Sequence, residues 1–145
     1  MISKRRGREF AMQLLYSVEV GKGAFASVLK SMSDDPDLPS DAKEYGGKLA
    51  RQVLEHQEEI DQKIKEVSSS WDIERIAVID RLIISCAAAE LMFFKDIPTG
   101  VAINEAIDIA KKFSTGESSR FVNGVLDAIA KSFSNSIQRN PNDPQ

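Results

Sequence analysis

The sequence has few of the residues on which catalytic and metal sites are most often built. It contains one cysteine, Cys86, and one histidine, His56. A single cysteine cannot form an intramolecular disulfide, and a chain with so little cysteine suits a reducing cytoplasm. No cysteine or second histidine lies near His56 in the sequence, so we interpret it as a solvated surface residue and expect no metal site.

Long apolar runs and strand patterns are also missing. No apolar run approaches the ~18 residues of a membrane-spanning helix, so no membrane association is expected. The N-terminus, MISKRRGREF, is basic but is not followed by an apolar segment, so a secretory signal is not expected. No segment alternates apolar and polar residues as a half-buried strand does. The sequence therefore predicts an all-α protein.

Catalytic motifs are absent as well. The sequence has no phosphate-binding glycine loop, dinucleotide-binding fingerprint, HExxH, CxxC or serine elbow. Its acidic residues are scattered rather than paired on one expected buried face. Cys86 lies in the small-residue run Ser85–Ala89, where nothing would lower its pKa, so we interpret it as a core residue. We expect no enzyme activity and no cofactor.

Apolar residues at helical spacing occupy most of the chain. With 145 residues, 42% hydrophobic and 28% charged, the composition is that of one soluble globular domain. We assign residues 1–137 to this domain and expect residues 138–145 to be a disordered tail. The spacing predicts helices over Ser3–Val20, Ala24–Met32, Ser40 or Asp41 to Leu54, Glu58–Ser69, Ile73–Phe94, and two more between Asp96 and Phe133.

The last two expected helices contain residues that periodicity does not explain. Asn104 and Asn123 are poor helix formers, and Gly124 costs about 1 kcal/mol relative to alanine. Such costs suggest a gain in packing or binding. Between these helices we expect Gly116 to end the first, and Thr115 or the serines after it to cap the second.

Charge is distributed unevenly along the chain. Residues 1–9 contain four basic side chains and one carboxylate, a net charge of +3. The whole chain has a net charge of −3, so the remaining residues carry −6. This basic start suits an anionic partner, although a solvated terminus would look the same. Arginines followed by Gln13 and Tyr16 on one helix form a composition that single-stranded RNA requires. Tyr16 could instead be a half-buried core residue.

The fifth expected helix is apolar nearly all round and should be central. Its exceptions are charged side chains that must face water, one another or a partner: Glu74, Arg75, Asp80, Arg81 and Glu90. Asp80 and Arg81 could simply be solvated. Trp71, just before this helix, is expected to anchor the core where helices meet.

Several segments along the chain are informative through their order and spacing: Arg5–Tyr16, Trp71, Ile79–Ile83, Glu90-Leu91, Asp96–Pro98, Val101–Ala106, Ala110–Phe113 and Phe121–Asp127. Together they resemble the NusB family of bacterial transcription antitermination factors, over nearly the whole chain. Ser85 and Ala89 depart from the family, which often has Arg and Tyr there. The resemblance implies about seven helices in two perpendicular three-helix subdomains, with an extra short helix.

The resemblance also implies a function. Family members pair with NusE, a protein of the small ribosomal subunit, and bind single-stranded boxA RNA in ribosomal RNA leaders. The resulting complex on RNA polymerase suppresses termination. The sequence does not decide whether the chain forms a homodimer. The implied RNA-binding residues are Lys4, Arg5, Arg6, Arg8, Gln13, Tyr16, Glu117, Arg120 and Phe121, and the implied partner-binding residues are Glu74, Asp80 and Arg81.

The resemblance suggests roles for the residues that helical periodicity leaves unexplained. Gly124 would mark a close helix contact, while Asn104 and Asn123 would hydrogen-bond to fix the helix pair, or Asn123 would face RNA. The segment before Phe121 would form the second half of an RNA surface that begins at the arginine-rich start. Two other readings stay open: a domain related to the N-terminal part of RNA cytosine methyltransferases, and a helical adaptor that does not bind RNA.

Overall fold

The computed structural model describes residues 4–69 and 76–138, with side chains described as far as residue 133. Within these ranges the chain forms seven α-helices and no strand, which confirms the all-α prediction. None of these helices is long and apolar enough to cross a membrane. The helices are α1 (Lys4–Gly21), α2 (Phe25–Met32), α3 (Ser40–Glu55), α4 (Gln57–Val67), α5 (Val78–Phe93), α6 (Thr99–Phe113) and α7 (Gly116–Gln138).

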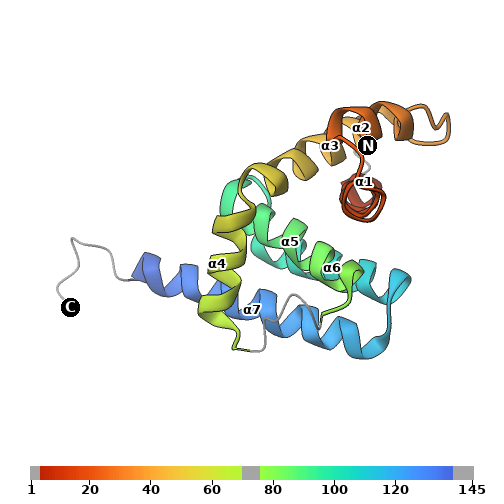
Figure 1. Ribbon diagram of the computed structural model, residues 1–145. Helices are drawn as coiled ribbons and strands as arrows, with labels where there is room; N and C mark the ends of the chain where they lie inside the picture. The colour runs from red at the N-terminus through yellow and green to blue at the C-terminus, as the bar shows by residue number, and fades with distance from the viewer. Residues whose placement is uncertain (1–3, 70–75, 139–145) are drawn as a thin grey trace.

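The helices form two groups that pack across each other. Helices α1, α2 and α3 lie together at the top of Figure 1, and α4, α5, α6 and α7 lie below them. In this view α1 is seen along its axis, whereas α5, α6 and α7 run across the picture. Helix α5 belongs to the lower group and contacts α1 and α3 of the upper group, so it joins the two groups.

Helices α1 and α3 cross in close contact at Gly7 and Gly46, and this glycine crossing fixes the position of α1. A Cβ atom on Gly46 of α3 would lie 2.5 Å from the carbonyl oxygen of Gly7 and 2.8 Å from Phe10 Cδ2. Real Cβ atoms do not approach backbone so closely, so only glycine permits this contact between α1 and α3. Gly46 weakens the helix that contains it by roughly 1 kcal/mol, and the close packing offsets this cost.

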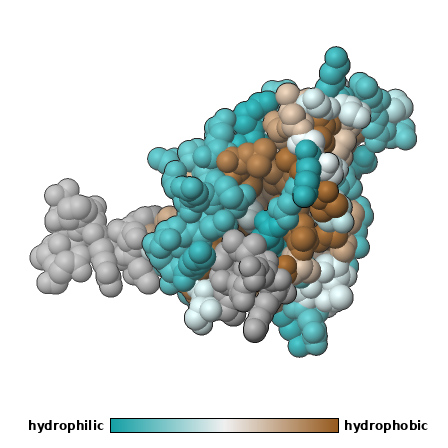
Figure 2. All heavy atoms as spheres, in the orientation of Figure 1, coloured by the Kyte–Doolittle hydropathy of each residue, from teal (hydrophilic) through white to brown (hydrophobic). Residues whose placement is uncertain are grey.

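Helix α5 forms the centre of the molecule. Every residue from Asp80 to Glu90 is buried, as expected for a helix that is apolar nearly all round. The small residues between Ser85 and Ala89 let neighbouring helices approach closely. In Figure 2 hydrophilic side chains cover α4, and hydrophobic surface shows at the centre of the same face, where the two groups meet.

Several predicted helix ends need correction. Helix α5 begins at Val78, because Ala77 has an extended backbone with ψ of 139°. Helix α3 begins at Ser40, the first of its two expected starts, and Pro39 takes the N-cap position. Gly116 is the first residue of α7 and does not end α6. Trp71 lies outside the described residues.

The expected cap of α7 is present, but two other interpretations of this region are wrong. The backbone N–H of Ser118 donates to Thr115 Oγ1 at 3.2 Å, as an N-cap should provide. No atom outside the helix lies within 4 Å of a Cβ built on Gly124, so Gly124 does not mark a close helix contact. Asn104 and Asn123 are exposed, and neither side chain forms a hydrogen bond with another described residue.

Candidate nucleic-acid interface

One face of α1 presents polar and aromatic side chains to solvent. Arg6 and Gln13 are exposed, and Tyr16 is 39% exposed. Their spacing of seven and three residues places them on the same side of the helix. Arg6 forms no ion pair with a described residue, so its guanidinium is available to an external anion. The exposure of Tyr16 argues against the core interpretation of this residue.

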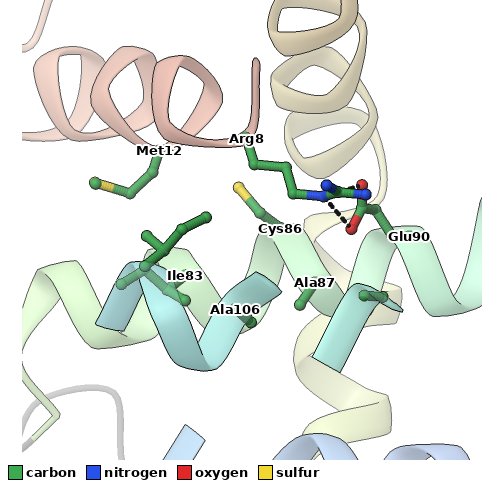
Figure 3. A pocket seen from close by; sticks show the side chains of 9 residues that line it. Arg8, Met12, Ile83, Cys86, Ala87, Glu90 and Ala106 are labelled. Atoms are coloured by element: carbon green, nitrogen blue, oxygen red, sulfur yellow. Dashed lines mark hydrogen bonds and ion pairs between the residues drawn. The ribbon is translucent and has the colours of Figure 1, made fainter. Parts of the chain in front are cut away.

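Arg8 points in the opposite direction, into the interior (Figure 3). Only 5% of the residue is exposed. Its Nε lies 2.9 and 3.0 Å from the two carboxylate oxygens of Glu90, and its Nη1 lies 3.2 Å from Glu105 Oε1. The structure therefore buries Arg8 and pairs its charge with carboxylates of α5 and α6, which argues against a direct contact with RNA.

Glu90 is the centre of a buried polar cluster. It accepts hydrogen bonds from Arg8 and from the hydroxyl of Tyr45 on α3. Burial raises the pKa of Glu90, and the nearby Arg8 opposes that rise. Burial and the Glu90 carboxylate both raise the pKa of Tyr45. The cluster therefore joins α1, α3 and α5 through charge-assisted hydrogen bonds, which are stronger than neutral ones.

Arg5 is exposed but is bound by two carboxylates of α6. Its Nε donates to Glu105 Oε1 at 3.1 Å, and its Nη2 donates to Glu105 Oε2 and to Asp108 Oδ2, the latter at 2.7 Å. The hydrogen bond to Glu105 is the main reason that the pKa of Arg5 is raised. Arg5 must exchange these carboxylates for phosphate if it binds RNA. Lys4, beside it, lies 5.5 Å from the Tyr45 ring centre.

The start of α7 holds the other residues expected to contact RNA. Arg120 and Glu117 are exposed, and neither forms an ion pair with a described residue. Phe121 is half-buried and lines a hollow with Val67 at the end of α4 and with Gly124. No described side-chain contact joins these residues directly to the exposed face of α1.

Asp80 and Arg81 of α5 connect the end of α1 indirectly to the start of α7. Arg81 forms an ion pair with Glu19 at the end of α1, and Ser118 at the start of α7 donates to Asp80 Oδ2 at 2.7 Å. Both residues are more than nine-tenths buried. They are therefore not solvated, which corrects that interpretation, and their assignment to a partner surface stays a prediction. Glu74 lies outside the described residues.

Sequence reasoning missed several residues that shape this interface. Tyr45, Glu105, Asp108 and Lys112 bind or flank the arginine-rich start, yet none was singled out. For Glu105 and Asp108 a signal existed, because two carboxylates three residues apart lie on one side of a helix. Glu90 was expected to face water, another charged residue of its own helix or a partner, whereas its carboxylate pairs inside the fold with Arg8 of α1.

The described residues offer little for metal chemistry. Among them, no group of three or more His, Cys, Asp or Glu side chains is placed to hold a metal ion. Cys86 is fully buried in α5, and burial raises the pKa of its thiol, which disfavours the reactive thiolate.

The fold and the surface define an all-helical protein whose first helix exposes an unpaired arginine and an aromatic ring on one face. Comparison with known proteins narrows this class. The model of the NusB family matches residues 5–131, and the chain belongs to that family. Membership agrees with the non-catalytic role expected from the sequence.

Individual relatives cover most of the chain. The transcription antitermination protein NusB of Geobacter sulfurreducens is 44% identical over 131 residues, which span 90% of this chain and 95% of that protein. That of Methylacidiphilum infernorum is 39% identical over 132 residues, spanning 90% and 92%.

Solved structures show the same fold. NusB of T. maritima superposes with a TM-score of 0.80 at 36% identity, covering 90% of this chain and 93% of that one. A crystal structure of antitermination factors NusB and NusE in complex with double-stranded RNA matches with a TM-score of 0.75 at 31% identity, covering 91% and 99%.

Proposed function

We propose that this protein is a transcription antitermination factor that pairs with NusE and binds single-stranded boxA-type RNA in ribosomal RNA leader transcripts. The assembly would act on RNA polymerase in the cytoplasm to suppress termination. The observation that carries the proposal is the unpaired guanidinium of Arg6, which shares an exposed helix face with Gln13 and Tyr16.

The chemistry of this face suits a single strand. A guanidinium neutralises phosphate, and an exposed tyrosine ring provides a stacking surface for an unpaired base. Lys4 and Arg5 flank Arg6, and Arg120 and Phe121 lie at the start of α7. The positive end of that helix also favours phosphate. In our proposal Arg8 positions the arginine-rich start from inside and does not touch RNA.

We place the partner surface around the start of α5 and the exposed carboxylate of Glu19 at the end of α1. The acidic body outside residues 1–9 provides charge complementarity for a basic ribosomal protein. Glu74, Asp80 and Arg81 belong to this region of the chain. Because Asp80 and Arg81 are buried, we propose that they hold the surface in shape while its exposed neighbours make the contacts.

A binding titration tests the proposal. Labelled boxA-type RNA and a scrambled RNA are titrated with the protein, with and without NusE, at several salt concentrations. We expect tighter binding to boxA RNA when NusE is present. Arg6→Ala should weaken binding and reduce the salt dependence of log K by about 0.7 for one phosphate contact to a single strand.

Lys65→Ala, which removes an exposed cation from α4, is the matched control and should change binding little. Equal affinity for boxA and scrambled RNA in the presence of NusE would contradict the sequence-specific function. Equal effects of Arg6→Ala and Lys65→Ala would contradict the assignment of the surface.

A further inference from the structure

A groove beside the exposed face of α1 has an unassigned role. It lies between α1, the connection from α2 to α3, and the end of α6, and its free volume is about 420 Å³. Arg6 and Gln13 form one edge, and Lys112 and Asp35 form others. The groove is therefore continuous with the proposed RNA surface and extends it toward residues that the family resemblance did not assign to RNA binding.

The floor of the groove is apolar. Phe10 and Leu38 are buried beneath it, and Met32 and Phe113 are half-buried at its sides. Helix α2, which ends at Met32, contains no fully buried residue, so this wall is held by fewer contacts than the others. A flat aromatic ligand could contact the floor while its polar edge stays near the rim.

The rim is divided by charge. Arg6 has no described ion-pair partner, and Lys112 is 59% exposed although its Nζ also binds Glu9 at 3.1 Å. These two cations come from α1 and α6. Asp35 lies on the α2–α3 connection, where its Oδ1 accepts the backbone N–H of Asp37 at 2.9 Å. No described residue donates to its Oδ2.

We propose that this groove holds one unstacked nucleotide of the bound RNA and selects guanine. The phosphate would bind Arg6 and Lys112, and the base would lie over the apolar floor with its Watson–Crick edge toward Asp35. Guanine presents two parallel donors, N1–H and the 2-amino group, to a carboxylate, whereas uracil presents one donor between two acceptors. This inference rests on the proposed RNA binding and adds the base that the groove reads.

The test uses a short uridine RNA with one guanine, and the same RNA with inosine, which lacks the 2-amino group, in its place. The unmodified protein should bind the guanine RNA about tenfold more tightly, the effect of one good base contact. Asp35→Asn should remove this preference. Asp34→Asn removes the same charge from the same connection outside the groove and should keep it.

A second measurement follows the groove directly. In protein labelled at the methionine methyl groups, RNA should shift the NMR signal of Met32 in the groove and leave that of Met92 on α5 unchanged. An unshifted Met32 signal with RNA bound would overturn the inference. A Met32 signal that shifts with NusE but not with RNA would overturn it in favour of a protein segment in the groove.

The outcomes separate this inference from the proposed function. If Arg6→Ala weakens RNA binding but Asp35→Asn leaves the ratio of guanine to inosine affinity unchanged, RNA binding stands and the nucleotide pocket does not. If Arg6→Ala has no more effect than Lys65→Ala, the proposed surface itself is wrong. Equal changes from Asp35→Asn and Asp34→Asn would show a general charge effect and would overturn base selection.

Discussion

The guanidinium of Arg8 on α1 and the carboxylate of Glu90 on α5 form a buried ion pair, with side chains 6% and 1% exposed. Four residues on α1, α3, α5 and α6 take part in the surrounding hydrogen bonds: Arg8, Tyr45, Glu90 and Glu105. The helix that presents Arg6 and Tyr16 to solvent is therefore fixed from within by another of its own arginines.

This pair predicts an asymmetric response to mutation. Arg8→Met leaves Glu90 buried without its cation and should lower the free energy of unfolding by about 3 kcal/mol. Adding Glu90→Gln removes the stranded charge and keeps an acceptor for the Tyr45 hydroxyl, so the double variant should be more stable than Arg8→Met alone. Urea denaturation measures both. If the double variant loses as much free energy of unfolding as Arg8→Met and Glu90→Gln lose together when made singly, the charges are not coupled.

The glycine crossing predicts opposite results at two glycines. Gly46→Ala places a methyl group against the Gly7 carbonyl and should destabilise the protein by about 1–3 kcal/mol. Gly124→Ala meets no neighbouring atom within 4 Å and should stabilise it by roughly 0.5–1 kcal/mol through helix propensity. Thermal unfolding compares the two, and destabilisation by Gly124→Ala would contradict the open surroundings of that residue.

The carboxylates around Arg5 predict a variant with improved RNA binding. Asp108 binds Arg5 at 2.7 Å, and both side chains are 48% exposed. Asp108→Asn should release Arg5 toward phosphate and raise affinity up to about fivefold, since an exposed ion pair contributes roughly 0–1 kcal/mol. Asp127→Asn removes an equally exposed carboxylate, which pairs with Lys131 on α7. An equal gain in that control would mean that only net charge matters.

Tyr45 predicts a specific loss of stability at alkaline pH. Burial, with the Glu90 carboxylate, raises its pKa above the ordinary value of about 10. Above pH 10 the unfolded chain therefore loses the phenolic proton while the folded protein keeps it, so stability falls as pH rises. The stability advantage of the wild type over Tyr45→Phe should shrink, by at most about 1.4 kcal/mol per pH unit. Denaturation series from pH 8 upward measure it, and a constant difference would refute it.

Local patterns were sufficient for the helices and insufficient for the interior contacts. Helical spacing located α2 and α4 to within a few residues, because each has one apolar stripe. The start of α5 was misplaced because apolar spacing continues through Ile76, and no glycine or proline marks the extended Ala77. The backbone turns there without a signal in the sequence.

The site shows the same limit. Composition placed the arginines, Gln13 and Tyr16 on one helix, but it left open which of them face solvent and whether Tyr16 belongs to the core. The burial of Arg8 could not follow from composition, because Glu90 is 82 positions away and only the tertiary fold brings the two together. Gly124 was misjudged for a related reason, because sequence does not distinguish a helical glycine that meets another helix, as Gly46 does, from one that meets open space.

The contacts of Arg81 with Glu19 and of Asp80 with Ser118 attach the end of α1 and the start of α7 to one turn of α5. A protein that docks on that turn would stabilise both halves of the RNA surface in one arrangement. Thermodynamic linkage then makes the effect reciprocal. The factor by which the partner raises the affinity for RNA equals the factor by which RNA raises the affinity for the partner. The ternary complex can therefore be stable although neither ligand binds tightly alone.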